Sequence, residues 1–422
     1  MAELNKSQQR VYNLVTTERR SVFFTGDAGT GKSFLLRRII DALRLVSCTF
    51  VTASTGIAAC NIGGTTVHSF AGVGIATDPK EALAEKVARD ARAASRWRRC
   101  NTLIIDEISM IDADLFDKLE FVARHVRRSS LPFGGIRLVL CGDFFQLPPV
   151  FKRSSPSTNR FCFQSEQWEK CVPTCVVLDE IYRQKNEEFI AMLREIRRGI
   201  VSPKTEHILS TLTPIGKDTD TYTQLRSRND ECDAINRSKL AALDGDMKEF
   251  HAKEWHLPGE DQTMNMLRNN CQAPCLLQLR VHAQVILLKN LEVASGLSNG
   301  SRGVVCGFSA SSLPIIRFSN HMEKEIEPAE FVIEREGRKI ASLVQLPLKL
   351  AWALSIHKSQ GMTIPMLCVC LSGVFEFGQA YVALSRATDL SSLSVTNFSP
   401  SVVRAHPSVI QFYDSISDSS ST

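Results

Sequence analysis

The chain has 422 residues, 44% of them hydrophobic and 23% charged, which excludes an intrinsically disordered chain, a collagen-like chain and a coiled-coil rod. Fifty lysines and arginines against 45 aspartates and glutamates give a formal net charge of +5, which permits a polyanionic partner without requiring one. No uninterrupted apolar stretch approaches the roughly 18–20 residues that a bilayer span needs, so we expect no membrane protein.

The thirteen cysteines are scattered along the chain, and their odd number and low density favour a reducing compartment over a secreted disulfide scaffold. Two Cys-x3-Cys pairs, Cys171/Cys175 and Cys271/Cys275, have a spacing at the edge of known zinc patterns. We interpret them as buried small hydrophobic residues, so we expect no structural metal. The first twenty residues include acidic positions and lack an apolar core, so no signal or transit peptide is predicted.

Apolar runs of strand length alternate with helical patterns along the first part of the chain. Buried strands of a parallel sheet are predicted at residues 22–25, 49–53, 102–105 and 136–141. Helices are predicted between them, at residues 33–45 and 113–128. This β-α-β rhythm is typical of a doubly wound α/β fold.

A second α/β set follows a change in pattern near residues 180–215. Its predicted elements are a strand at 221–225, a helix at 230–243, and strands at 346–354 and 366–371. The segment between them differs, because Asn299-Gly300 is a hairpin signal. Short strand-like runs follow it at residues 304–308, 315–318, 331–334 and 339–344. We therefore expect a small antiparallel β insertion within the second unit.

A phosphate-binding motif follows the first predicted strand and fits the pattern G-x-x-x-x-G-K-[ST]. It consists of Gly26, Asp27, Ala28, Gly29, Thr30, Gly31, Lys32 and Ser33. The glycines let backbone N–H groups wrap a phosphate, and the N-terminus of the following helix adds partial positive charge. We expect Lys32 to reach the β- and γ-phosphates of ATP and Ser33 to bind Mg²⁺.

Asp106 and Glu107 stand at the end of the third predicted strand. A P-loop protein needs a carboxylate at a strand tip to hold Mg²⁺, so Asp106 is a candidate metal ligand together with Ser33. Glu107 can then orient and deprotonate the attacking water. An Asp-Glu pair alone would be interpreted as a surface pair. The apolar strand before it and the upstream phosphate motif favour the catalytic interpretation.

Beyond these motifs, residues 103–149 resemble the signature region of the PIF (petite integration frequency) helicases, a superfamily 1 branch that moves 5′→3′ on DNA. The runs that carry the resemblance are Leu103-Ile-Ile-Asp-Glu-Ile-Ser-Met-Ile-Asp112, Pro132-Phe-Gly-Gly135 and Leu138-Val-Leu-Cys-Gly-Asp143-Phe-Phe-Gln146-Leu-Pro-Pro149. The resemblance covers residues 4–398 of this sequence. It implies an α/β fold of two RecA-like P-loop domains with parallel sheets, a helical wedge insertion in the first and an SH3-like β insertion in the second.

The implied domain limits follow from this fold. The first RecA-like ATPase domain is placed at residues 1–180, with a basic wedge insertion at 72–99. The second is placed at 181–297 and 347–412, interrupted by the SH3-like β insertion at 298–346, and a disordered tail is expected at 413–422. Residues 80–99 carry seven basic and three acidic side chains. A solvated helix face is the alternative interpretation of this charge.

The resemblance also implies roles around the nucleotide. Gln8, in Leu4-Asn-Lys-Ser-Gln8, matches the glutamine that reads adenine, and an ordinary helix N-cap by Ser7 is the alternative interpretation of this segment. Gln146 matches the sensor of the γ-phosphate. Arg183 and Arg386 match the two arginine fingers, which in the absence of these motifs would be interpreted as solvated or ion-paired arginines.

A third group of residues matches the motifs that hold a single strand or couple DNA to the nucleotide. It consists of Thr55, Gly56, His68, Phe70, His357, Lys358 and Ser359, and Gly361 follows as a nucleotide-site residue. Hydroxyl and backbone N–H groups can bind phosphates, and aromatic or imidazole rings can stack on bases. For Phe70 the alternative is a plain hydrophobic core residue.

These features predict an ATP- and Mg²⁺-dependent 5′→3′ DNA helicase that binds single-stranded and forked DNA. The resemblance implies action on RNA–DNA hybrids and G-quadruplexes, and a role in replication, repair, recombination and telomere maintenance. Two alternatives remain, an ATP-driven single-stranded DNA remodeller without unwinding and a RecD-type helicase subunit. We expect a monomer without targeting or regulatory extensions, which lies in the nucleus or mitochondrion if the source is eukaryotic.

Overall fold

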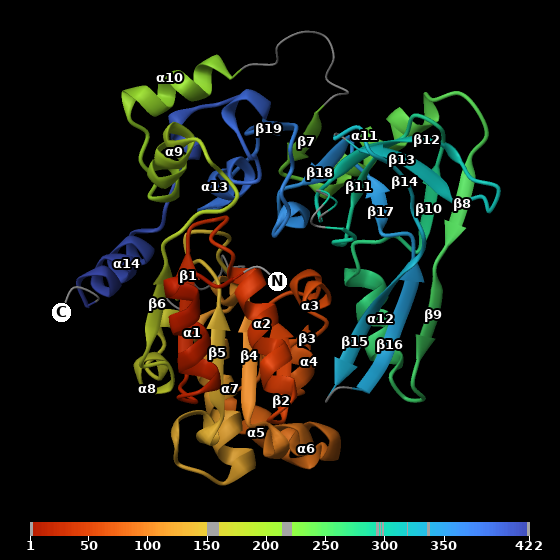
Figure 1. Cartoon of the computed structure of the whole chain (residues 1–422). Helices are drawn as coiled ribbons and strands as arrows, with labels where there is room; N and C mark the ends of the chain where they lie inside the picture. Colours follow the sequence, from red (N-terminus) through yellow and green to blue (C-terminus); the bar gives the residue numbers. More distant parts are fainter. Residues whose placement is uncertain are drawn as a thin grey trace. The chain divides into compact units, whose positions relative to one another are not determined.

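The computed structural model describes residues 3–149, 160–212, 222–292, 295, 297, 299–318, 320–335 and 338–419. The chain divides into two compact units (Figure 1). The first comprises Met1–Tyr182, Ile333–Ile340 and His406–Thr422, and the second comprises Arg183–Val332 and Ala341–Ala405. Each unit contains a parallel sheet, as the two α/β sets in the sequence predict.

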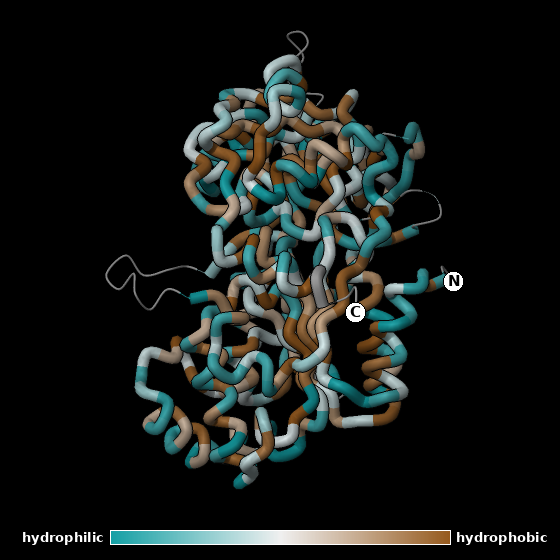
Figure 2. The backbone as a smooth tube through the Cα atoms, turned by 90° about the vertical axis from the view of Figure 1, so that its left-hand side faces the viewer, coloured by the Kyte–Doolittle hydropathy of each residue, from teal (hydrophilic) through white to brown (hydrophobic). Residues whose placement is uncertain are grey.

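The first unit is built on a six-stranded sheet with the order β3-β2-β4-β5-β1-β6, in which all neighbours are parallel. Its strands are β1 (Val22–Gly26), β2 (Thr49–Ala53), β3 (Thr65–Thr66), β4 (Thr102–Asp106), β5 (Arg137–Cys141) and β6 (Cys175–Leu178). The four strands predicted from apolar runs are therefore present. Parallel strands that carry helices on their faces are buried, which explains the runs of Val, Ile, Leu and Phe. In Figure 2 the strands of this sheet are largely brown, the colour of hydrophobic residues.

Helices of the first unit connect and cover these strands. They are α1 (Lys6–Thr16), α2 (Lys32–Arg44), α3 (Gly56–Asn61), α4 (Val67–Ala71), α5 (Lys80–Arg89), α6 (Ala91–Arg99), α7 (Ala113–Arg127) and α8 (Trp168–Cys171). Short 3-10 turns lie at Ile108–Met110, Pro132–Gly135 and Cys162–Gln164. Apolar residues of α1 and α2, such as Val11, Leu36 and Ile39, share one core with Phe24 and Ile104 of the sheet.

The predicted wedge insertion contains α5 and α6, which pack against α7. The chain turns at Asp90, whose carboxylate caps α6 by accepting hydrogen bonds from the N–H groups of Arg92 (2.9 Å) and Ala93 (3.1 Å). On α6, Trp97 is fully buried and donates a 3.0 Å hydrogen bond to the carbonyl oxygen of Ala71. The insertion is thus anchored to the first unit through its apolar side, and its charged side chains are exposed at Arg89 and Arg98, among others.

The C-terminal segment corrects one expectation. Residues 413–419 are not a disordered tail, because they belong to helix α14 (Pro407–Ser419), which is part of the first unit. Val409 and Tyr413 are buried, and the ring of Phe412 stacks on that of Phe163 at 4.2 Å. These apolar contacts outweigh the polar, Ser-rich composition. Residues 420–422 lie outside the described part of the chain.

The second unit contains a four-stranded parallel sheet with the order β18-β7-β19-β20. Its strands are β7 (Thr223–Arg226), β18 (Ala353–Ser355), β19 (Leu367–Cys370) and β20 (Leu393–Thr396). The helices of this unit are α9 (Glu187–Arg197), α10 (Pro203–Thr211), α11 (Asn229–Ala241), α12 (Asp261–Asn270) and α13 (Gln379–Leu384). A 3-10 turn, η7, lies at His357–Ser359, and two more lie at Leu390–Ser392 and Pro400–Val402.

Antiparallel strands, of which Ile333–Ile340 is grouped with the first unit, form the rest of the second unit, and they extend beyond the predicted insertion. A five-stranded sheet joins β14 (Glu323–Glu325), β13 (Pro314–Phe318), β12 (Arg302–Phe308), β11 (Gln284–Leu287) and β17 (Leu348–Leu350). A three-stranded sheet joins β15 (Ala329–Arg335), β16 (Arg338–Gln345) and β9 (Lys253–His256), and β8 (Lys248–His251) pairs with β10 (Leu276–Leu279). The single strand predicted at 346–354 is in fact two, because β17 joins the antiparallel sheet and β18 the parallel one.

Candidate functional site

The phosphate motif forms a strand–loop–helix turn at the end of β1. Gly31 caps α2 with φ +80°, a conformation that favours glycine, and a Cβ there would lie 2.7 Å from Nε2 of Gln8. A Cβ on Gly26 would lie 2.7 Å from the carbonyl oxygen of Leu178. The Nζ of Lys32 donates hydrogen bonds to the carbonyl oxygens of Gly26 (2.7 Å) and Asp27 (3.0 Å). Glycine is therefore required at positions 26 and 31, because a Cβ there would be too close to Leu178 or Gln8.

Asp106 and Glu107 lie where β4 ends, at the same carboxyl edge of the sheet as the phosphate loop. Burial raises the pKa of the Asp106 carboxyl, while the hydrogen bond from Glu107 N–H (2.9 Å) and the charge of Lys32 act in the opposite direction. Glu107 adopts φ +51°, which is rare for a residue with a side chain. Such backbone conformations persist where the surrounding structure imposes them, and they cluster at functional sites.

The donor set at this edge fits a magnesium ion. Asp106 offers a buried carboxylate in the field of Lys32, and Ser33 offers a hydroxyl in the first turn of α2. Carboxylate and hydroxyl oxygens are the ligands that Mg²⁺ takes in P-loop proteins, alongside phosphate oxygens.

Gln146 lies just beyond β5, the strand between β4 and β1 in the sheet. Its side chain is buried, and its Nε2 donates a 3.3 Å hydrogen bond to Oδ2 of Asp143. Asp143 is fully buried, and its Oδ1 accepts hydrogen bonds from the N–H of Phe145 and the hydroxyl of Tyr413, both at 3.2 Å. Three of the predicted catalytic groups, Lys32, Glu107 and Gln146, thus follow neighbouring strands of one sheet.

The predicted adenine-reading glutamine is buried against the phosphate loop. Gln8 accepts from the N–H of Asn5 (3.2 Å), and its Nε2 donates to the carbonyl oxygen of Thr30 (3.2 Å). The alternative of an N-cap by Ser7 is wrong, because Asn5 caps α1 and forms a capping box with Gln8. Gln8 therefore ties the start of α1 to the last turn of the loop.

Tyr182 is a neighbour of this loop that sequence reasoning did not single out. Its N–H donates to the carbonyl oxygen of Gly29 (2.9 Å), and its hydroxyl accepts from Asn5 Nδ2 (2.8 Å) and donates to Glu180 (3.0 Å). A Cβ on Gly31 would lie 3.7 Å from its ring, which is half exposed. The one feature of the sequence that could have indicated Tyr182 is its position directly before the predicted arginine finger Arg183.

The two predicted arginine fingers lie in the second unit and converge on Ser385. Arg183 donates from Nη1 to the carbonyl oxygen of Ser385 (2.9 Å) and from Nε to the hydroxyl of Thr363 (3.0 Å). Arg386 donates from Nη2 to the hydroxyl of Ser385 (3.0 Å). Burial, and then the charge of Arg386, lower the pKa of Arg183 to about 9, so it is still protonated at pH 7. Gly361, two residues before Thr363, adopts φ +78°.

The residues predicted to hold a single strand in the first unit fall into two groups. Thr55 caps α3, its hydroxyl accepting from the N–H of Ala58 (3.2 Å), and Gly56 is the buried first residue of that helix. His68 on α4 is half buried, and burial lowers its pKa. Phe70 is different and corrects the prediction, because it is only 1% exposed and cannot stack on a base.

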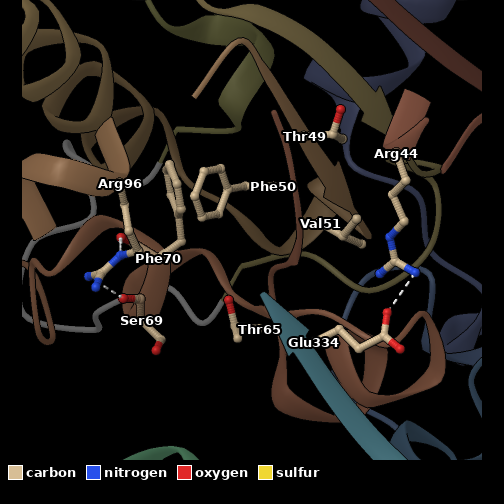
Figure 3. A pocket seen from close by; sticks show the side chains of 9 residues that line it. All are labelled: Arg44, Thr49, Phe50, Val51, Thr65, Ser69, Phe70, Arg96 and Glu334. Carbon is tan, nitrogen blue, oxygen red and sulfur yellow. Dashed lines mark hydrogen bonds and ion pairs between the residues drawn. The ribbon is translucent and has the colours of Figure 1, made fainter. Parts of the chain in front are cut away.

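Phe70 is a core residue of α4 that packs against α6 and β2. Figure 3 shows its ring beside that of Phe50, and the two ring centroids are 4.9 Å apart. The ring of Trp97 lies 4.8 Å from it. Arg96 donates to the carbonyl oxygens of Phe70 (2.7 Å) and Ser69 (3.1 Å), which closes the cluster at the surface. In the same pocket, Arg44 pairs with Glu334 at 2.9 Å. The two hydrogen bonds of Arg96 thus hold α6 against α4.

In the second unit the predicted coupling residues lie on η7. His357 is exposed and Lys358 is half buried, whereas Ser359 is fully buried and donates to the carbonyl oxygen of Ile356 (2.7 Å). Ser359 is therefore an internal residue, and its prediction as a DNA contact is wrong. Lys358 and Lys349 line the same pocket. Lys349 was not singled out from the sequence. Burial, and to a smaller extent the charge of Lys358, lowers the pKa of Lys349 to about 7.

Two features are absent from the described residues. No helix in the ranges described above combines the length and hydropathy that a membrane span requires. Within the same ranges, His, Cys, Asp and Glu side chains nowhere gather in a group of three that could hold a metal ion.

Comparison with known proteins decides the family. The family model "PIF1-like helicase" matches residues 3–207, and the model "DNA helicase Pif1, 2B domain" matches residues 263–308. The crystal structure of the Pif1 helicase from Candida albicans is 39% identical, covers 99% of this chain and 100% of that one, and superimposes with a TM-score of 0.75. This chain belongs to the Pif1 helicase family. Its two parallel sheets are accordingly those of RecA-like domains, as the resemblance implied.

Two further relatives extend this finding. The human "ATP-dependent DNA helicase PIF1" is 46% identical over 417 residues, which are 97% of this chain and 63% of the human protein. The chain thus spans less than two thirds of that relative's length. A Bacteroides Pif1 helicase in complex with ADP-AlF3 and single-stranded DNA is 28% identical, with a TM-score of 0.63 and coverage of 99% of this chain and 98% of that one.

Proposed function

We propose that this chain is the motor of an ATP-dependent DNA helicase that moves 5′→3′ along single-stranded DNA and separates duplex strands. The observation that carries the proposal is the grouping of Lys32, Asp106, Glu107 and Gln146 at one edge of one parallel sheet. Neighbouring parallel strands present their carboxyl ends together, which is where α/β proteins bind nucleotides. The family membership supports the same conclusion.

ATP hydrolysis is assigned to the first unit's residues. The loop from Gly26 to Gly31 offers backbone N–H groups to the phosphates, and Lys32 neutralises the β- and γ-phosphates. Ser33 and Asp106 would hold Mg²⁺, which supplies positive charge to the same oxygens. Glu107 orients the attacking water and accepts its proton, and Gln146 senses the γ-phosphate. Tyr182 offers a ring for the adenine beside Gln8.

Arg183 and Arg386 supply further positive charge to the γ-phosphate. Phosphoryl transfer depends mainly on positioning and on charge stabilisation, so two arginines from the second RecA-like domain make hydrolysis depend on closure of the domains. Closure that alternates with release would then move the strand. Gln184 keeps this region in place by donating to the carbonyl oxygens of Ser385 (3.2 Å) and Ala387 (2.8 Å).

Single-stranded DNA is the proposed track, as it is a ligand of the Bacteroides relative. Thr55, Gly56 and His68 are its proposed contacts in the first unit, and His357 and Lys358 in the second. Forked duplex is the proposed substrate for unwinding, with the exposed arginines of α5 and α6 against its backbone as a wedge. RNA–DNA hybrids and G-quadruplexes, and a role in replication, repair, recombination or telomere maintenance in nucleus or mitochondrion, belong to the same proposal.

ATP turnover stimulated by DNA tests the motor. The wild-type chain is assayed with ATP and Mg²⁺, with and without oligo(dT), and Gln146→Ala and Arg386→Ala are assayed beside it. We expect stimulation by the oligonucleotide and a loss of about 100-fold in kcat for Arg386→Ala, since arginine fingers contribute rates of that order or more. ATP turnover that ignores single-stranded DNA would contradict the proposal.

A further inference from the structure

Helix α14 packs two aromatic residues, Phe412 and Tyr413, against the first unit, although it follows the second unit in the sequence. Phe412 stacks on Phe163, and the ring of Tyr413 stacks on that of Phe145 at 4.7 Å and 29°. Tyr413 is only 5% exposed. A tyrosine buried to this degree needs partners for its hydroxyl, and those partners are neighbours of the phosphate loop and of Gln146.

The hydroxyl of Tyr413 joins the ends of two neighbouring strands. It lies 2.6 Å from Oγ1 of Thr25, the residue directly before Gly26 of the phosphate loop. It also lies 3.2 Å from Oδ1 of Asp143 and accepts a 3.2 Å hydrogen bond from the N–H of Phe144, both just beyond β5. A phenol has one proton to donate and can accept two hydrogen bonds. The partners present match this capacity.

The hydrogen bond from Tyr413 to Asp143 sets the direction of the others. The hydroxyl of Tyr413 donates its one proton to Oδ1 of Asp143, so Thr25 donates its own hydroxyl proton to Tyr413. The other carboxylate oxygen of Asp143 accepts from Nε2 of Gln146 at 3.3 Å. A continuous chain of side-chain hydrogen bonds therefore runs from Thr25 through Tyr413 and Asp143 to Gln146.

We propose that Tyr413 is a positioning residue for ATP hydrolysis, which holds Asp143, and through it the amide of Gln146, in a fixed relation to the phosphate loop. This inference rests on the proposed function, in which Gln146 contacts the γ-phosphate. Loss of the hydroxyl leaves Asp143 buried with one donor fewer, and a buried carboxylate then turns toward its remaining donors. The amide of Gln146 turns with it, whereas the hydrogen bonds from Lys32 to the carbonyl oxygens of Gly26 and Asp27 do not involve Tyr413 and are kept.

Tyr413→Phe tests this with the smallest possible change, because it keeps the stacking on Phe145 and removes only the hydroxyl. We expect kcat for DNA-stimulated ATP hydrolysis to fall about five- to tenfold, because small misplacements of a catalytic group cost rate. The KM for ATP should stay within about twofold, since ground-state contacts are kept. Phe412→Leu is the matched control, which weakens the packing of the same helix and leaves the hydroxyl in place. It should lower the melting temperature and keep the wild-type kcat.

A double mutant separates positioning from mere anchoring of the helix. If Tyr413 acts through Gln146, then Gln146→Ala with Tyr413→Phe should have the same kcat as Gln146→Ala alone. The inference would be overturned if the double mutant lost kcat by the product of the two single losses, or if Tyr413→Phe kept the wild-type kcat. It would also be overturned if Phe412→Leu lost as much kcat as Tyr413→Phe. Should Gln146→Ala keep the wild-type kcat, the proposed role of Gln146 fails and this inference with it. Loss in Gln146→Ala without loss in Tyr413→Phe refutes only the role of Tyr413.

Discussion

Lys32 donates a 2.7 Å hydrogen bond from its ammonium group to the carbonyl oxygen of Gly26, so its charge lies over the turn of the phosphate loop. The lysine and the glycine stand at opposite ends of that loop, and α2 begins at the lysine. The backbone N–H groups of the loop, the N-terminus of α2 and the Lys32 ammonium thus all place positive charge at the same point, where a phosphate would bind.

Lys32→Ala removes the only side-chain cation of the motif. ATP turnover should fall to background, because the β- and γ-phosphates lose their main protein charge, while binding of single-stranded DNA should stay within about twofold. The measurement is steady-state ATP hydrolysis beside fluorescence anisotropy with a labelled oligonucleotide. Lys204→Ala, an exposed lysine paired with Glu188, is the control and should match the wild type. Equal turnover in Lys32→Ala would refute the assignment of the loop.

Glu107→Gln keeps the shape of the side chain and removes its basicity. We expect kcat to fall about 100-fold or more, the range in which general bases act, with the affinity for ATP unchanged. Single-turnover hydrolysis and equilibrium binding of a fluorescent ATP analogue separate the two quantities. Asp114→Asn on α7, whose carboxylate pairs with Lys118, is the matched control. Should Glu107→Gln weaken ATP binding and leave the chemical step unchanged, Glu107 would not be the base.

Phe70→Leu distinguishes a core residue from a DNA contact. The substitution opens space between Phe50 and Trp97 and should lower the free energy of unfolding by about 1–3 kcal/mol. The affinity of the folded protein for single-stranded DNA should not change. Denaturant unfolding and anisotropy measure these effects, and His68→Ala is the companion variant expected to weaken DNA binding. A loss of DNA affinity in Phe70→Leu without loss of stability would restore the DNA contact.

His406 makes the stability of α14 depend on pH. Its Nδ1 accepts a 3.2 Å hydrogen bond from the N–H of Ser408, and burial lowers its pKa from the usual 6.5. The unfolded chain therefore takes up a proton at a higher pH than the folded chain. The free energy of unfolding must then decrease as the pH falls through 6.5, until the folded histidine is protonated too.

His406→Asn keeps a cap acceptor for the helix and cannot titrate. Other groups titrate in the same range, so the informative quantity is the difference between the two proteins. Thermal melts from pH 7.5 to 5.5 should show a smaller decrease in melting temperature for the variant than for the wild type. Parallel curves would mean that His406 titrates alike in both states.

The parts of the site that the sequence predicted are those that lie within one short run of residues. Lys32, Asp106 and Glu107 sit where an apolar strand gives way to a polar turn, and that pattern is visible without any partner. Phe70 was misjudged, because an aromatic residue next to a polar motif has the same local pattern whether it faces a core or a base. Its neighbour Trp97 lies 27 residues further along the chain.

Long-range contacts account for the other differences. Tyr182 reaches Asn5 across 177 positions and Tyr413 reaches Thr25 across 388, so neither contact has a local signature. The Ser-rich end was expected to be disordered, since composition does not reveal that Tyr413 is buried against the ring of Phe145. The β insertion predicted at 298–346 is too short, because β11 and β17, which lie outside that range, pair with its sheet.

Strand separation tests the central claim most directly. One forked DNA carries a single-stranded tail only at a 5′ end and the other only at a 3′ end, each with ATP, Mg²⁺ and either the wild-type chain or Lys32→Ala. The proposed function predicts that the wild type opens the 5′-tailed substrate alone and that Lys32→Ala opens neither. Opening from the 3′ tail, or ATP turnover that opens neither substrate, would contradict it, and the latter would favour a remodeller that acts on single strands.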